Sequence, residues 1–166
     1  MDREEISIQL TVIHAKCSQC GYERILYCLP ESSYGERIVS TRDGKLCAYV
    51  DLMKENIIPE LKVICKDLLD KWNITLSQNN MGRLVSKIYY VTCDKISGQE
   101  IDSTPGWKCS NCQNGQMKED ELFGERQMKI MMPYVTHERW NSLDLDRKHQ
   151  MVENELKKQG FKHNDL

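Results

Sequence analysis

The sequence predicts an α+β fold, in which a mostly antiparallel sheet is covered on one face by two packed helices. Apolar residues alternate with polar ones through much of the first third of the chain, which is the period of half-buried strands. Two later segments space their apolar residues three or four positions apart, as amphipathic helices do. Two cysteine pairs sit where a strand pattern gives way to a loop pattern.

Strands are expected throughout the N-terminal third. Residues 6–14 alternate apolar with polar or smaller side chains up to the first cysteine pair, and residues 22–28 are rich in β-forming side chains. Residues 37–50 are expected to form a hairpin, because Asp43 and Gly44 favour a tight turn between two strand patterns.

A change of period after residue 51 predicts the first helix, of about four turns at roughly 3.6 residues per turn. Pro59 fits such a helix only near its start. The apolar stripe consists of Ile57, Leu61, Ile64, Cys65, Leu68 and Trp72.

The middle of the chain is expected to return to strands. Residues 84–93 contain a run of β-branched and aromatic side chains that favours a strand, with a helical start left open. Residues 127–135 are expected to form a Met-rich strand that Pro133 places at an edge or ends early. Its methionines, Met128, Met131 and Met132, are expected to fill the core, with a flexible surface for a partner as the alternative.

A second helix is expected over residues 142–159. Ser142 is expected to cap its start, and Gly160 to stop it. Its apolar stripe consists of Leu145, His149, Val152 and Leu156. The polar and aromatic residues 137–140 are expected to lead into this helix, with Trp140 packed beneath it.

Length and composition indicate a single domain over residues 1–166. A chain of 166 residues can bury its own core, and no stretch has the apolar length of a membrane span. Lys and Arg total 23 against 25 Asp and Glu, a balance that disfavours nucleic-acid binding. The acidic start, unlike a secretory signal, predicts a cytoplasmic protein, in which eight cysteines are better explained as thiols and metal ligands than as disulfides.

Nearly the same five residues occur twice, as Lys-Cys-Ser-Gln-Cys and Lys-Cys-Ser-Asn-Cys. We call residues 16–21 the first knuckle and residues 108–115 the second knuckle. Two cysteines separated by two residues can place both sulfurs on one tetrahedral metal, while the backbone between them donates N–H groups to the thiolates. The sequence therefore predicts one structural Zn²⁺, with Lys16 and Lys108 offsetting part of its thiolate charge. The predicted ligands are Cys17, Cys20, Cys109 and Cys112.

These two cysteine pairs resemble the knuckles of the zinc ribbon, a family of small β-rich modules that clamp one zinc. The resemblance covers only the knuckles and their flanking strands. Because 88 residues separate Cys20 from Cys109, a hairpin-helix-strand unit at residues 22–107 must be inserted between the knuckles, or the two pairs bind separate metals. We favour one shared site, since each pair alone lacks enough ligands for tetrahedral zinc.

The other cysteines are expected to pack as small apolar residues within strands or helix stripes. They are Cys28, Cys47, Cys65 and Cys93. Two substitutions among the ligands stay open at this point: His14 precedes Cys17 by three residues, and Cys93 ends the neighbouring strand predicted over residues 84–93.

The motifs favour binding over catalysis. The sequence lacks the patterns of zinc deaminases and metalloproteases, and four thiolates leave no open position on zinc. We expect a non-enzymatic, zinc-stabilised interaction protein with a protein partner, such as a bacterial regulator or a toxin-neutralising, immunity-type protein. The alternative is a zinc-ribbon module that binds nucleic acid or acts in transcription. Its basic face would comprise Lys16, Arg24, Arg37, Arg42, Lys45 and Lys108.

Overall fold

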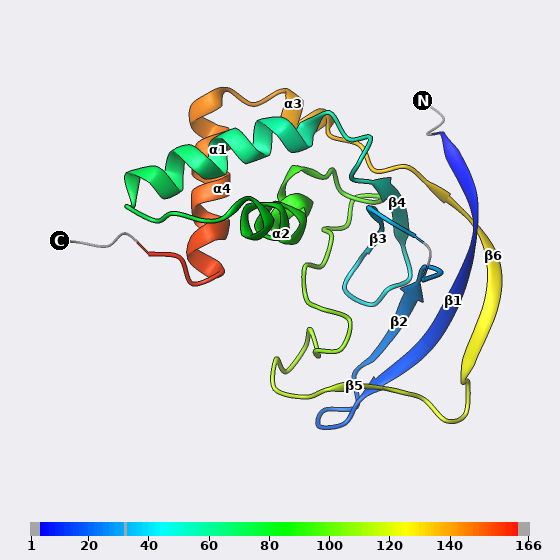
Figure 1. Ribbon diagram of the computed structural model, residues 1–166. Helices are drawn as coiled ribbons and strands as arrows, with labels where there is room; N and C mark the ends of the chain where they lie inside the picture. Colours follow the sequence, from blue (N-terminus) through cyan, green and yellow to red (C-terminus); the bar gives the residue numbers. More distant parts are fainter. Residues whose placement is uncertain (1–3, 32, 163–166) are drawn as a thin grey trace. The chain divides into compact units, whose positions relative to one another are not determined.

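A computed structural model describes residues 4–31 and 33–162 and confirms the α+β class (Figure 1). The chain forms two compact units, each built from two separate stretches of sequence. The sheet unit comprises the residues up to 53 and residues 95–135, and the helical unit comprises residues 54–94 and the residues from 136 onward. The expectation of a single domain stays a prediction.

Strand β1 (Glu5–Cys17) is the centre of the main sheet. On one side it pairs antiparallel with β2 (Glu23–Cys28). On the other it pairs antiparallel with β6 (Glu125–Pro133) along most of its length and with the short β5 (Met117–Glu119) at its end. The first strand therefore runs to the first cysteine of the first knuckle, as predicted, and β6 ends at the predicted proline.

The predicted hairpin is formed by β3 (Glu36–Ser40) and β4 (Cys47–Asp51), which pair antiparallel. Its turn depends on Gly44, whose φ is +73° and whose added Cβ would lie 2.0 Å from the carbonyl oxygen of Ile25. No larger residue fits there without moving the backbone of β2.

Side chains from β1, β4 and β6 form the core of the sheet unit. Leu10, Tyr49 and Met132 are buried together at its centre. The core prediction therefore holds for Met132, whereas Met128 and Met131 are 45% and 58% exposed. Partly buried side chains surround the centre: Ile6, Ile8, Tyr27, Leu29, Ile38, Cys47 and Ile130.

The helical unit confirms the first predicted helix. Its buried stripe includes Leu61, Ile64 and Leu68, as the spacing predicted. Within the described residues, no helix has the length and apolar character needed to cross a bilayer. The elements are α1 (Ile57–Lys71), α2 (Gln78–Ile88), the 3-10 helix η1 (Tyr89–Thr92), α3 (Glu138–Asn141) and α4 (Leu145–Lys158).

The predicted strand over residues 84–93 is wrong, because this segment ends α2 and forms η1, and the open alternative of a helical start is correct. Ser77 caps α2 by accepting a hydrogen bond from the backbone N–H of Asn80. Leu84 and Ile88, four residues apart, are both buried on one side of the helix. Burial of this helical face outweighs the β propensity of the aromatic and β-branched residues, which is a weak preference.

The last helix begins later than predicted. Asp144, not Ser142, is its N-cap, and its carboxylate accepts a hydrogen bond from the N–H of Arg147. Ser142 instead follows the short α3 and donates its hydroxyl to the carbonyl of Arg139. Leu145 is 60% exposed and so lies outside the buried stripe, whereas Gly160 follows the helix end with φ +91°, as its predicted role requires.

Trp140 is fully buried in the helical unit, which confirms its predicted packing. Its indole N–H donates to Glu60 at 2.8 Å, and the ammonium of Lys148 on α4 reaches the same carboxylate at 2.7 Å. Lys148 also lies 5.3 Å from the centre of the Trp140 ring. The Glu60 carboxylate on α1 thus contacts side chains of both α3 and α4.

His137 also joins the two stretches of chain that form the helical unit. Its Nδ1 lies 2.9 Å from the carbonyl oxygen of Thr92, and its Nε2 lies 3.0 Å from the carboxylate of Glu55 and 3.1 Å from the hydroxyl of Tyr89. Burial opposes protonation, but hydrogen bonds to Glu55 and Thr92 and the charge of Asp94 outweigh it and raise the pKa of His137. With oxygen acceptors beside both nitrogens, the doubly protonated ring is favoured.

We expect the protonated ring of His137 to make the stability of the protein pH-dependent. Because its folded pKa lies above the unfolded value of about 6.5, its stabilisation is complete below that value and is lost as pH rises through the folded pKa. Chemical denaturation at a series of pH values across this range gives the free energy of unfolding. As pH rises, this free energy should fall for wild type relative to His137→Gln. Glu55→Gln should likewise reduce the change of unfolding free energy with pH. Parallel curves for wild type and His137→Gln would contradict the assignment.

Candidate metal centre

The register of β1 brings the two knuckles together. The first knuckle begins at the end of β1, and β5, which follows the second knuckle, pairs with the same end through Cys17 and Met117. The backbone N–H of Ser18 donates to the carbonyl of Gln116 at 3.0 Å. Segments that are far apart in sequence therefore meet through strand pairing.

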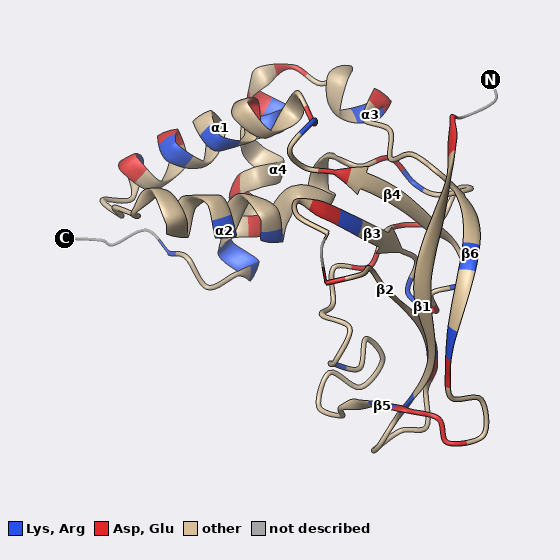
Figure 2. Cartoon of the chain, turned by 45° about the vertical axis from the view of Figure 1, so that its right-hand side comes forward, with Lys and Arg blue, Asp and Glu red and all other residues tan. Residues whose placement is uncertain are grey.

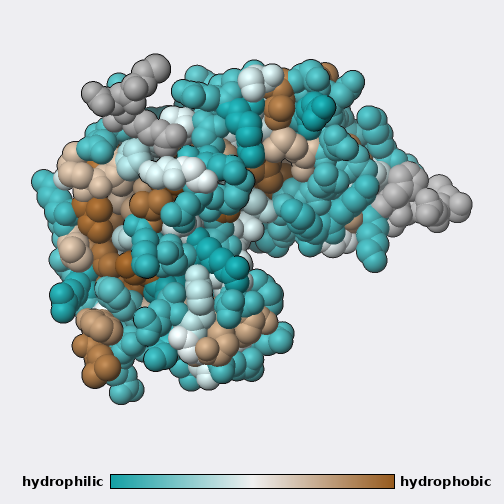
Figure 3. Space-filling model, turned by 180° about the vertical axis from the view of Figure 1, so that it is seen from behind, coloured by the Kyte–Doolittle hydropathy of each residue, from teal (hydrophilic) through white to brown (hydrophobic). Residues whose placement is uncertain are grey.

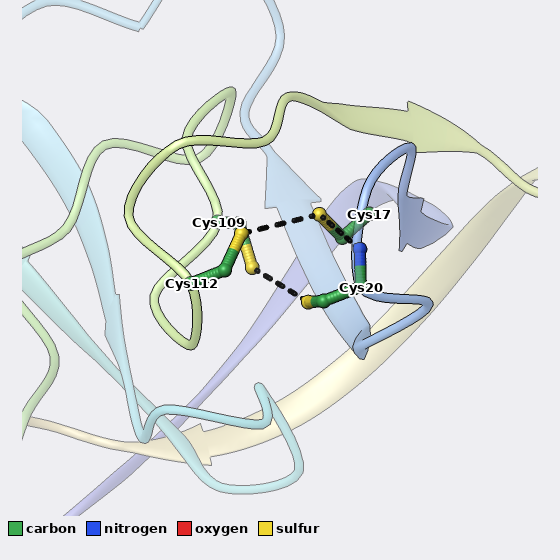
Figure 4. Close-up of side chains that lie close together, drawn as sticks. All are labelled: Cys17, Cys20, Cys109 and Cys112. Carbon is green, nitrogen blue, oxygen red and sulfur yellow. Dashed lines mark hydrogen bonds between the residues drawn. The ribbon is translucent and has the colours of Figure 1, made fainter.

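All four predicted ligands converge at this point, as Figure 4 shows. Their sulfurs lie within 4.8 Å of one another. The Cys17 and Cys112 sulfurs are 3.7 Å apart, and so are those of Cys20 and Cys109. A metal about 2.3 Å from each of four sulfurs would hold them about 3.8 Å apart at the corners of a tetrahedron, whereas a disulfide bond is about 2.05 Å long.

Backbone N–H groups of both knuckles point at these sulfurs. Such hydrogen bonds stabilise thiolates and fix their orientation around a metal. The pairs are Gln19 and Cys20 to Cys17 at 3.4 and 3.5 Å, Asn111 to Cys109 at 3.4 Å, and Gly115 to Cys112 at 3.2 Å.

Hydrogen bonds to the sulfurs also shift the pKa values of the thiols. The N–H of Tyr22 and the side-chain amide of Asn111 lower the pKa of Cys20 to about 6. Backbone N–H groups also lower the pKa of Cys112, whereas desolvation raises that of the buried Cys109. The two exposed or half-exposed thiols thus favour the thiolate form that binds metal.

Gly115 supplies a separate test of whether the site fits a metal. An added Cβ there would lie 2.2 Å from the sulfur of Cys17 and 3.3 Å from that of Cys112. The second knuckle therefore wraps the sulfurs so closely that only hydrogen fits at this position. Four sulfurs at this spacing suit a soft tetrahedral cation, namely zinc or iron.

The two substitute ligands lie elsewhere. His14 stacks on Phe123, with ring centroids 5.2 Å apart. Cys93 is buried in the helical unit, where its sulfur lies 3.9 Å from the carbonyl oxygen of Tyr89. The sulfur cluster formed by the described residues contains neither of them.

The prediction that the other cysteines are core residues is correct for Cys65 and Cys93, which are buried, and only partly so for Cys47. It is wrong for Cys28, which is exposed. Cys28 ends β2 directly after Tyr27, which packs against the core, and successive side chains of a strand point to opposite faces of the sheet, so Cys28 faces away from the core.

Arg42 and Asn111 form a pair beside the sulfur cluster that the sequence did not predict. The guanidinium of Arg42 donates to the Asn111 side chain at 2.9 Å, and the Asn111 amide donates to the sulfur of Cys20 at 3.7 Å. Arg42 also lies 5.7 Å from the centre of the Tyr22 ring. Lys16, which was expected to offset thiolate charge, pairs with Glu23 at 3.7 Å.

Comparison of the chain with protein-family models, with curated proteins and with solved structures found no match. The metal centre is therefore inferred from the sulfur geometry, and the resemblance to the zinc ribbon stays a prediction.

We expect Gly115→Ala to weaken metal binding strongly, because its methyl group would displace the Cys17 sulfur. Overpacking of this kind costs about 1–3 kcal/mol in stability. Gly106→Ala is the matched control, since its Cβ would meet only the Leu26 side chain at 3.5 and 3.9 Å. Competition with a chromophoric chelator measures the metal affinity of both variants. Equal affinities would show that the second knuckle does not enclose a metal.

Proposed function

We propose that this chain is a non-enzymatic protein that is stabilised by one structural zinc ion and binds another macromolecule, most simply a protein. The observation that supports it best is the convergence of four sulfurs from two knuckles on one point. A bacterial regulator or a toxin-neutralising protein of the cytoplasm is one version of this proposal.

A structural role for the metal follows from the donor set. Four thiolates would fill the tetrahedral positions of zinc and leave none for water or substrate. Because the ligands come together only in the folded chain, the free energy of metal binding becomes folding free energy. The metal would also offset part of the repulsion among the thiolates.

The basic residues proposed for a nucleic-acid face are largely engaged with the chain itself. Arg24 is buried and contacts Asp102 at 3.1 Å, and Arg42 is held by Asn111 and Tyr22. Figure 2 shows acidic as well as basic residues along the strands of the sheet unit, and an acidic stretch after β5. Two further pairs are Lys16 with Glu23 and Lys45 with Asp43. These pairings favour a protein partner over a phosphate backbone.

Mobility shift with random DNA and RNA at low salt tests the nucleic-acid alternative directly. We expect no change in the mobility of either nucleic acid under conditions where a basic module would bind it. A shift that weakens steeply with added salt would favour nucleic acid instead.

We expect one zinc per chain by elemental analysis of protein purified without added metal. Cys17→Ser or Cys112→Ser should lower the melting temperature far more than Cys28→Ser or Cys47→Ser, because only the first two remove a ligand. The Cys28 variant is the cleanest control, since that thiol is exposed. Absence of metal would reject the site, iron would reject zinc, and two metals per chain would reject the shared geometry.

We also expect the metal to act as a clasp on the 88 residues between Cys20 and Cys109. Closing a loop of this length would stabilise the fold by about 4–5 kcal/mol if the metal behaves like a covalent cross-link. Mild chelation should then speed hydrogen exchange in residues 61–72 as well as in the knuckles. Faster exchange confined to the knuckles would show that the rest of the chain folds without the clasp.

A further inference from the structure

A cavity of about 380 Å³ opens on the sheet unit next to the first knuckle. Its lining includes the rings of His14, Tyr22 and Phe123 and the carboxylates of Asp43 and Asp120. This volume is within the range of ligand sites, which are about 300–1,000 Å³, and the mixture of aromatic walls with a few acidic groups restricts what it can bind.

The aromatic wall is supplied by the turn between β5 and β6. Phe123 stacks on His14 with centroids 5.2 Å apart and remains 52% exposed, and its neighbour Leu122 is 89% exposed. Figure 3 shows an apolar patch at the lower left, where this turn lies. Adjacent large apolar side chains this exposed are typical of an interaction site rather than of a bare turn.

The same turn is acidic. Residues 118–125, which we call the acidic turn, contain Glu119, Asp120, Glu121 and Glu125 against the single Lys118. Asp120 accepts the backbone N–H of Leu122, and no cation among the described residues lies within ion-pair distance of it. Its charge is therefore free to meet a cation from outside.

The cations in the cavity wall do not cancel this charge. Arg24 is already paired with Asp102, its side chain being 5% exposed, and Lys45 lies 3.8 Å from Asp43. After these internal pairs and that of Glu23 with Lys16 are counted, the carboxylate of Asp120 is the acidic group of the lining that has no ion-pair partner among the described residues.

We propose that this cavity receives a lysine or arginine side chain of the partner protein, with the cation over the ring of Phe123 and beside the carboxylate of Asp120. This inference rests on the proposed function and names the chemistry of its partner: a protein with a basic segment. The chain already uses the same chemistry internally, where Arg42 lies over Tyr22. Carboxylates at the cavity would repel the phosphates of a nucleic acid.

The probe is the pentapeptide acetyl-Gly-Arg-Gly-Arg-Gly-amide, titrated into the full-length, isotope-labelled protein by NMR. We expect saturable shifts at His14, Asp120 and Phe123, and none with the peptide in which glutamate replaces arginine. Phe123→Ala and Asp120→Asn should each weaken binding about two- to fivefold, since an exposed cation–π contact is worth about 0.5–1 kcal/mol. Asp120→Asn keeps the acceptor for Leu122, so the turn should stay folded.

Asp70→Asn on α1 is the matched control, because it removes the same charge from an exposed site in the helical unit. The inference is overturned if the arginine peptide causes no saturable shifts, if both variants bind like wild type, or if a single-stranded RNA oligonucleotide occupies the cavity instead. Metal content is measured on the same sample. Zinc-loaded protein that ignores the peptide overturns this inference alone, and metal-free protein that binds it overturns only the zinc centre.

Discussion

Four sulfurs held within 4.8 Å of one another are the constraint on which the sheet unit depends. Such a group is unfavourable by itself. Ionised thiols repel one another, and neutral thiols are weak acceptors for the N–H groups of the knuckles that donate to them. A divalent cation reverses both effects. The lack of room for a Cβ at Gly115 shows how closely the backbone follows the sulfurs.

Strand β1 transmits this constraint to the rest of the unit. Its ladder with β5 positions the second knuckle, and its ladder with β6 leads back to the acidic turn. His14 lies three residues before Cys17 on the same strand, and the N–H of Asp120 donates to the His14 carbonyl at 2.7 Å. The sulfur cluster and the cavity are therefore successive features of one strand. If the cluster holds a metal, its removal should disturb the cavity by loosening the end of β1.

Local patterns in the sequence predicted what local physics determines. The repeated cysteine phrase predicted the sulfur cluster, the Asp43-Gly44 step predicted the hairpin, and apolar spacing predicted α1 and most of α4. The same reasoning failed for residues 84–93, where burial in the helical unit decides between helix and strand. It also failed for Cys28, because its neighbours Tyr27 and Leu29 are the side chains that pack against the core. No sequence pattern predicted the cavity, since its wall residues His14 and Phe123 are far apart in sequence.

Each unit is assembled from two distant stretches of chain, and polar contacts join those stretches in both. In the sheet unit Arg24 meets Asp102, and in the helical unit Glu55 and Glu60 meet His137 and Trp140. Of these groups Arg24 and Asp102 are mostly buried, whereas Glu55 and Glu60 are 23% and 38% exposed. Contacts of this kind add little net stability, because desolvation offsets their attraction, but breaking one leaves a charge without its partner. They therefore help to select which stretches pair. In the sheet unit, we expect the net free energy for joining the stretches to come from the apolar core and from a metal bound by the four knuckle cysteines, which divide equally between the two stretches.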